Sequence, residues 1–260
     1  VLDAYKAYFQ PLMTSFSESH PLLIYRTVKF LATCNVLLWM LTDGLPDTDI
    51  DDDHGWLFFI ALAYAIIDIQ VDCPSQHDDG QIQTEVLFQY LDIIFNQSTL
   101  STTDKDKKMS LLSEYRDRAV LMYLDEVYQE NIGSGNNRNH NNNNIKIRRR
   151  IIAAKRALEC EKQCWRLQQL AQQHPSGLPP DMATDLLIEK AVSTIRLIYH
   201  PQRIATIQTW RRLYWSAVAI QLLDDIADTT EDIADGLGGA TGLAICRGNI
   251  AQYIASVLDT

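Results

Sequence analysis

The chain has 260 residues, of which 47% are hydrophobic and 22% are charged, and its formal net charge is −10. This composition is that of an ordinary globular protein, long enough to bury a large core within one domain. The negative charge argues against nucleic acid as the main partner, because phosphate binding needs a basic surface. A small polyphosphate is still compatible with a few local basic residues.

The apolar residues recur with the 3.6-residue period of helices along nearly the whole chain, and strand-like alternation is scarce. We therefore expect an all-α fold, a single-domain bundle of about eight or more helices. The predicted helices span 22–41, 56–72, 81–97, 107–130, 145–173, 181–199, 203–234 and 240–258.

An Asn-rich segment at 133–144 is expected to be a mobile surface loop, because its low-complexity composition does not pack a core. The apolar run 57–67 is too short to span a bilayer, so we expect a soluble protein. Five cysteines form an odd and scattered set, which is typical of free thiols in a reducing compartment. We expect a cytoplasmic location, soluble or peripherally associated with a membrane. Organellar targeting stays open, because the first residue is Val rather than Met.

The predicted helix 56–72 ends in two carboxylates, Asp68 and Asp72, which are four residues apart and share one face. The carboxyl end of a helix is an unfavourable place for anions, because the helix dipole is negative there. We therefore predict that a cation lies next to these two carboxylates.

A second acidic stretch, Gln221-Leu-Leu-Asp-Asp-Ile-Ala-Asp-Thr-Thr-Glu-Asp232, follows an apolar helical run. At about 100° per residue, Asp224, Asp228, Glu231 and Asp235 fall within roughly 60° of one another, with Asp225 and Asp232 at the margin. Like charges held so close repel, and oxygen-only ligands favour a hard divalent cation such as Mg²⁺. If the two acidic helix ends face each other, they would hold Mg²⁺ and a diphosphate above an apolar pocket for an isoprenoid tail.

These residues carry a resemblance. Asp68-Ile-Gln-Val-Asp72 and Asp228-Thr-Thr-Glu-Asp232 resemble the two DxxxD motifs of the squalene/phytoene synthase family. Asp224-Asp225-Ile-Ala-Asp228 is also similar to the second aspartate-rich motif of chain-elongating trans-prenyl diphosphate synthases. Both families share the all-α isoprenoid synthase fold, with helices around a central apolar cavity, and the resemblance covers roughly residues 56–235.

The sequence also departs from both families. Cys73-Pro74 stands where chain-elongating enzymes have Arg-Arg-Gly, and no Gly-Lys-Arg segment precedes the first motif. Glu114-Tyr-Arg-Asp-Arg118 takes the place of the Gly-rich, Tyr-containing helix of squalene and phytoene synthases. A class I terpene cyclase, which ionises a single prenyl diphosphate, needs neither feature and is an open alternative. A non-catalytic scaffold of the same fold is another.

The resemblance implies a Mg²⁺-dependent enzyme that ionises a prenyl diphosphate of C10 to C20 and forms a C–C bond, as in head-to-head coupling. Two or three Mg²⁺ ions are implied, with Mn²⁺ as a substitute, and a homodimer is an open possibility. The implied catalytic residues are Asp68, Asp72, Asp228 and Asp232, and the implied metal ligands are these four with Asp224, Asp225 and Glu231. For the diphosphate we expect contacts from Arg116, Arg118, Arg26 and Arg211, and for a carbocation from the rings of Tyr64 and Tyr214.

Overall fold

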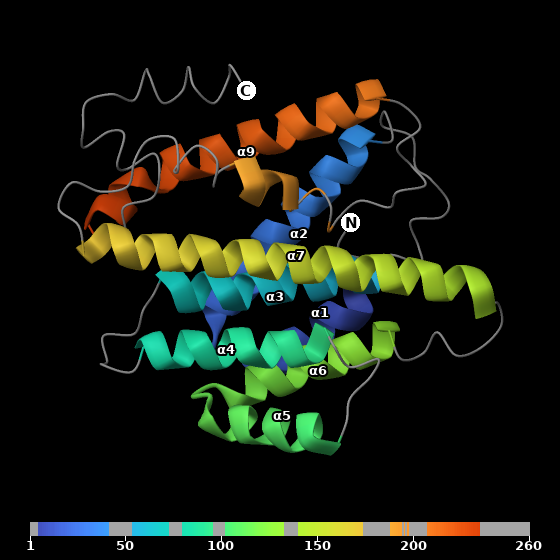
Figure 1. The fold of residues 1–260 in the computed structure, drawn as a ribbon, viewed down its shortest axis with the longest axis vertical. Helices are drawn as coiled ribbons and strands as arrows, with labels where there is room; N and C mark the ends of the chain where they lie inside the picture. Colours follow the sequence, from blue (N-terminus) through green and yellow to red (C-terminus); the bar gives the residue numbers. More distant parts are fainter. Residues whose placement is uncertain are drawn as a thin grey trace. The chain divides into compact units, whose positions relative to one another are not determined.

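The computed structural model describes residues 5–41, 54–72, 80–95, 102–132, 140–173, 188–193, 195, 197 and 207–234. Across these ranges the regular secondary structure is α-helical, which confirms the predicted all-α class (Figure 1). The isoprenoid synthase fold itself stays a prediction. The chain divides into two compact units, Val1–Lys155 and Arg156–Thr260, and each is described by itself. The single-domain organisation likewise stays a prediction.

The first unit is built around the apolar helix α3. It contains α1 (Lys6–Phe16), α2 (Pro21–Leu41), α3 (His54–Asp72), α4 (Gly80–Phe95), α5 (Thr102–Glu114), α6 (Arg118–Ile132) and the first part of α7 (His140–Gln173). Helix α3 packs against α2, α4 and α6, while α5 packs against both α4 and α6 (Figure 1).

Helix α3 is central because it has no polar side over most of its length. From 55 to 67 every residue except the half-buried Tyr64 is buried. The ring of Phe59 lies against those of Trp56, Phe95 and Tyr128, with centroids 5.2–5.9 Å apart. A helix that is hydrophobic all round is stable only when it is surrounded, and α3 meets that condition inside the unit.

The same helix is long and apolar enough to cross a membrane. Among the described residues it is the one helix that meets this criterion, through its window 54–71 with a mean hydropathy of 1.6. The window is longer than the run 57–67 considered from the sequence. Of its residues 67% are buried within the protein, as in the core helix of a soluble protein.

The helices of the first unit differ from the sequence prediction in two places. The predicted helix 107–130 is two helices, α5 and α6, separated by a turn at residues 115–117. Asp117 precedes α6, and its carbonyl oxygen accepts hydrogen bonds from the amides of Val120 and Leu121. Helix α1 was not predicted at all. It contains Pro11, a residue that normally disrupts a helix interior, yet it buries Leu12 and Phe16.

The Asn-rich segment was also predicted too long. Helix α7 begins at His140, so residues 140–144 are helical rather than loop, whereas residues 133–139 lie outside the described part. The second unit contains the remainder of α7, helical residues 188–193, and α9 (Ile207–Ala234). The predicted helix 181–199 is described only at residues 188–193, 195 and 197, which are helical, and the predicted helix 240–258 lies outside the described residues.

Candidate functional site

The carboxyl end of α3 carries an ion pair between two residues singled out from the sequence. Nη1 of Arg26, on α2, lies 2.5 Å from Oδ2 of Asp68. The two side chains are only 17% and 18% exposed. A half-buried carboxylate at the negative end of a helix dipole needs a positive neighbour. Arg26 supplies that charge from within the protein.

On another side of α3, Gln70 joins the helix to two other segments, the turn that contains Tyr115 and helix α4. Its Oε1 accepts a hydrogen bond from the hydroxyl of Tyr115 at 3.1 Å. Its Nε2 lies 3.5 Å from the carbonyl oxygen of Gly80 and 3.4 Å from Oγ1 of Thr84, both on α4. Gln70 lies between Asp68 and Asp72 in the first motif. It therefore anchors that motif to the turn between α5 and α6.

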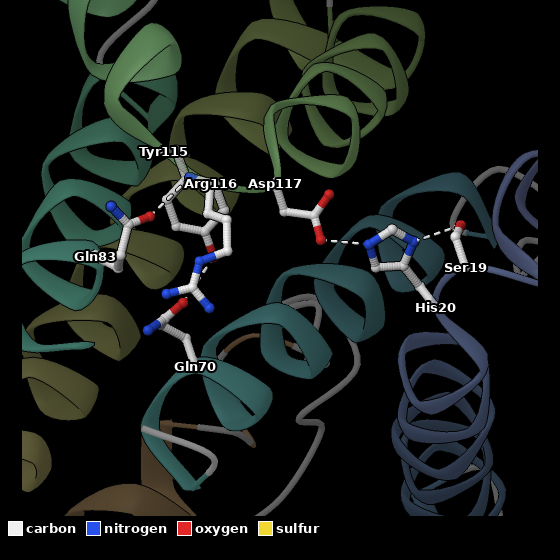
Figure 2. A network of polar contacts seen from close by, with 7 residues as sticks. All are labelled: Ser19, His20, Gln70, Gln83, Tyr115, Arg116 and Asp117. Carbon is white, nitrogen blue, oxygen red and sulfur yellow. Dashed lines mark hydrogen bonds and ion pairs between the residues drawn. The ribbon is translucent and has the colours of Figure 1, made fainter. Parts of the chain in front are cut away.

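Gln83 of α4 holds the same turn by its backbone. Its Oε1 accepts from the amide of Arg116 at 2.7 Å, and its Nε2 donates to the carbonyl oxygen of Glu114 at 3.1 Å. The side chain of Gln83 is only 7% exposed, so both of its polar atoms are used inside the protein. In Figure 2 the guanidinium of Arg116 extends from the turn toward Gln70. The two glutamines thus bring an arginine close to the acidic end of α3.

A third contact ties the turn to the start of α2. Nε2 of His20 pairs with Oδ2 of Asp117, and Nδ1 of His20 lies 2.7 Å from Oγ of Ser19 (Figure 2). His20 directly precedes α2, the helix that carries Arg26. His20 and the helices α3 and α4 therefore each contact the short turn at 115–117, from which Arg116 extends.

Tyr115 acts in this network as a neutral hydrogen-bond donor. Burial raises the pKa of its phenol well above the ordinary value, and the nearby carboxylate of Asp117 adds to the rise. The guanidinium of Arg116 lowers it by less. At neutral pH the hydroxyl therefore keeps the proton that it donates to Gln70.

Sequence reasoning gave no role to Ser19, His20, Gln70 or Gln83, and it quoted Gln70 only as part of the first motif. Asp117 was quoted only within the segment Glu114–Arg118. Asp is a preferred residue immediately before a helix, so Asp117 was a signal for the start of α6. The two glutamines gave no comparable signal, because an amide on a helix is usually solvated. Their roles depend on contacts between helices, which the sequence pattern does not display.

The other predicted arginines and tyrosines have ordinary surroundings. Arg118 is the first residue of α6 and is exposed, as is Arg211 on α9. The ring of Tyr64 lies 5.7 Å from that of Phe30, and the ring of Tyr214 lies 5.3 Å from that of Trp215. Each of the two tyrosine rings therefore packs against another aromatic ring.

For the remaining predicted metal ligands, the structure describes at most the position of the backbone and not the side chain. Asp72 is the last residue of α3, and its side chain lies outside the described part. The acidic residues of the second motif lie on α9, in the second unit, and their side chains are likewise not described: Asp224, Asp225, Asp228, Glu231 and Asp232. Asp235 lies beyond the end of α9, outside the described residues. The predicted convergence of the two motifs stays a prediction.

Whether these residues suit Mg²⁺ depends on Asp68. Its carboxylate offers the hard oxygen donors that Mg²⁺ prefers. In the described part of the chain, however, no group of three or more His, Cys, Asp or Glu side chains is arranged to hold a metal ion. The suitability of these residues for Mg²⁺ therefore depends on the oxygen donors of Asp68 and on the other motif carboxylates, whose side chains are not described.

Comparison of the chain with models of protein families, with curated proteins and with solved structures found no match. The fold and the contacts described above define the chain as an all-α protein with a polar cluster at the carboxyl end of a buried apolar helix.

Proposed function

We propose that the protein is a Mg²⁺-dependent isoprenoid synthase, which ionises a prenyl diphosphate and joins carbon atoms in a head-to-head coupling of the squalene/phytoene synthase kind. The observation that supports this most is the pairing of Arg26 with Asp68 at the end of α3. The pair brings a guanidinium, which binds phosphate groups, next to a carboxylate, which binds Mg²⁺, at the end of a long apolar helix.

The charges at this end of α3 suit a diphosphate leaving group. Arg26 is an anion-binding side chain, and Arg116 extends toward the same end from a turn that Gln70 of α3, Gln83 of α4 and His20 contact. Guanidinium groups bind phosphate oxygens in a bidentate manner, and their positive charge stabilises the negative charge that develops when the C–O bond breaks. Mg²⁺, when bound by Asp68 and the other motif carboxylates, would supply further positive charge to the same group.

Arg26 has two partners in this proposal. Without substrate it neutralises Asp68, which keeps a half-buried carboxylate stable. With a prenyl diphosphate present, the guanidinium pairs with the diphosphate, and the oxygens of Asp68 become available as ligands. In this proposal each of the two charges has a partner both before and after the substrate binds.

A second candidate function is a helical scaffold without catalytic activity. It is favoured by the same ion pair, because Arg26 already satisfies Asp68 without any metal. In this case the polar cluster would only hold α2, α3, α4 and the turn before α6 together.

Product analysis separates these functions. The protein is incubated with Mg²⁺ and with C10, C15 or C20 prenyl diphosphate, and hydrocarbon products are identified by mass. A product with twice the carbon number of the substrate supports head-to-head coupling. A cyclic product of unchanged carbon number identifies a terpene cyclase, and a diphosphate longer by five carbons, formed when isopentenyl diphosphate is added, identifies chain elongation. Lack of any turnover with all three substrates favours the scaffold.

A further inference from the structure

The start of α7 concentrates positive charge in an acidic chain. Residues 146–156 contain six of the 23 lysines and arginines, and no Asp or Glu occurs from 140 to 158. The chain as a whole has a formal net charge of −10, so this segment differs sharply from the rest. A local excess of cations creates a positive potential that attracts anionic partners. The proposed isoprenoid function uses none of these residues.

One side of this segment packs onto the first unit. The side chains of Ile151 and Ala154 are buried. The guanidinium carbon of Arg150 lies 5.5 Å from the centroid of the Trp56 ring on α3, which is a cation–π distance. These contacts fix the orientation of the helix about its own axis, so the residues on its opposite side face solvent.

The outer side carries a basic stripe, which consists of Arg148, Arg149, Ile152 and Lys155. All four side chains are exposed, Ile152 to 44%. At about 100° per residue, Ile152 lies between Arg149 on one side and Arg148 and Lys155 on the other, each within roughly 60° of it. An exposed Ile flanked by cations is typical of helices that lie at a membrane surface. There the apolar side chain enters the lipid while the long basic side chains reach the headgroups.

We propose that the basic stripe binds the surface of a bilayer that contains anionic phospholipids. The guanidinium and ammonium groups pair with lipid phosphates and carboxylates, and Ile152 inserts between the headgroups. The acidic residues elsewhere in the chain do not prevent this contact, because charges more than about 8 Å from the membrane are largely screened at physiological salt. Nucleic acid suits the stripe less well, since none of its side chains is an aromatic ring on which a base stacks. The proposal does not depend on the isoprenoid function.

Sedimentation of the full chain with lipid vesicles tests the proposal. One set of vesicles is phosphatidylcholine alone, and in the other about one third of the lipid is phosphatidylserine. We expect binding to the second set only, and weaker binding as the salt concentration rises. Arg148→Gln combined with Arg149→Gln should weaken binding at least about tenfold, because each basic residue near an anionic surface contributes about fivefold. Lys105→Gln combined with Lys107→Gln, at exposed positions of α5, removes the same charge and should bind like the wild type.

Ile152→Ser is a further variant that keeps every charge. It should weaken vesicle binding several-fold and leave the salt dependence unchanged, because only the inserted side chain is lost. Circular dichroism should show the wild-type helical content for all variants, since the substituted positions are exposed.

Three results would overturn the proposal. The first is a wild type that ignores anionic vesicles or binds pure phosphatidylcholine equally well. The second is unchanged vesicle binding after either substitution in the basic stripe. The third is displacement of the protein from anionic vesicles by single-stranded RNA at an equal phosphate concentration, which would assign the stripe to nucleic acid.

Discussion

Nη1 of Arg26 and Oδ2 of Asp68 form a 2.5 Å ion pair that joins α2 to the acidic end of α3. Both side chains are mostly removed from water, so neither charge is well screened. Arg26 supplies the positive charge that stabilises the Asp68 carboxylate at the negative end of the α3 helix dipole. It also brings together the two kinds of side chain that a metal-bound diphosphate requires.

The ion pair should contribute measurably to stability. We expect Arg26→Gln and Asp68→Asn each to lower the free energy of unfolding by about 1.5–3 kcal/mol, because each removes one side of this largely buried ion pair. The double variant should lose less free energy of unfolding than the two single variants lose together. Urea denaturation of the four proteins in a double-mutant cycle measures the coupling. Arg149→Gln, at an exposed position of α7, is the control and should change stability by less than about 0.5 kcal/mol. Additive effects of the two substitutions would contradict the pairing.

Gln83→Leu should destabilise the turn before α6. The substitution removes the acceptor of the Arg116 amide and the donor to the Glu114 carbonyl, and it leaves both backbone groups without these partners. We expect a loss of about 1–3 kcal/mol, measured by urea denaturation. Gln89→Leu, on an exposed position of the same helix, is the matched control. If the two variants are equally stable, Gln83 does not hold the turn.

Some of this arrangement could be predicted from the sequence, and some could not. Helix α3 was predicted at 56–72 and observed at His54–Asp72, because a long apolar run followed by carboxylates is a local signal. Arg26 and Asp68 were both named as site residues, yet their mutual pairing was not predicted. It joins side chains on two different helices, and the periodicity of each helix says nothing about which residues pair between them. The break between α5 and α6 had a local signal in Asp117, which precedes α6, whereas the contacts of Gln70 and Gln83 that hold the turn come from other helices.

Stability should fall steeply in alkaline solution. Burial, with a smaller contribution from Asp125, raises the pKa of Tyr128 from 10.0 to about 12. Burial also raises the pKa values of Tyr90, Tyr115 and Tyr123. A phenol with a raised pKa in the folded state stabilises the fold fully below its unfolded pKa, and this contribution is lost as pH rises through the folded pKa. We therefore expect the free energy of unfolding to be unaffected by these groups below about pH 10 and to fall between pH 10 and 12.

Tyr128→Phe tests whether the phenol of Tyr128 contributes to the loss of stability at alkaline pH. Oη of Tyr128 is buried without a hydrogen-bond partner among the described residues, so removing it should cost little at pH 7. The variant should lose less stability than the wild type between pH 10 and 12. Urea denaturation at several pH values provides the comparison. An identical pH dependence of the two proteins would show that this phenol does not contribute.

Because α3 lies in the core of the first unit, shortening a side chain at its centre should lower the stability strongly. Phe59 is 0% exposed and contacts three aromatic rings, so Phe59→Ala should destabilise the protein by about 3–5 kcal/mol through cavity formation. Ile82→Ala removes a comparable apolar group from a position that is 61% exposed and should have little effect. Thermal and urea unfolding of both variants measure the difference. A small effect at Phe59 would contradict its burial in the core.

The central claim is that the Asp68 end of α3 binds a divalent cation together with a diphosphate. Isothermal titration of Mn²⁺ in the presence of inorganic pyrophosphate tests it most directly, with Asp106→Asn on the exposed face of α5 as the control. We predict that the wild type and the control bind Mn²⁺ equally, while Asp68→Asn weakens binding at least tenfold and keeps its helical content. Equal Mn²⁺ affinity of all three proteins would contradict the account.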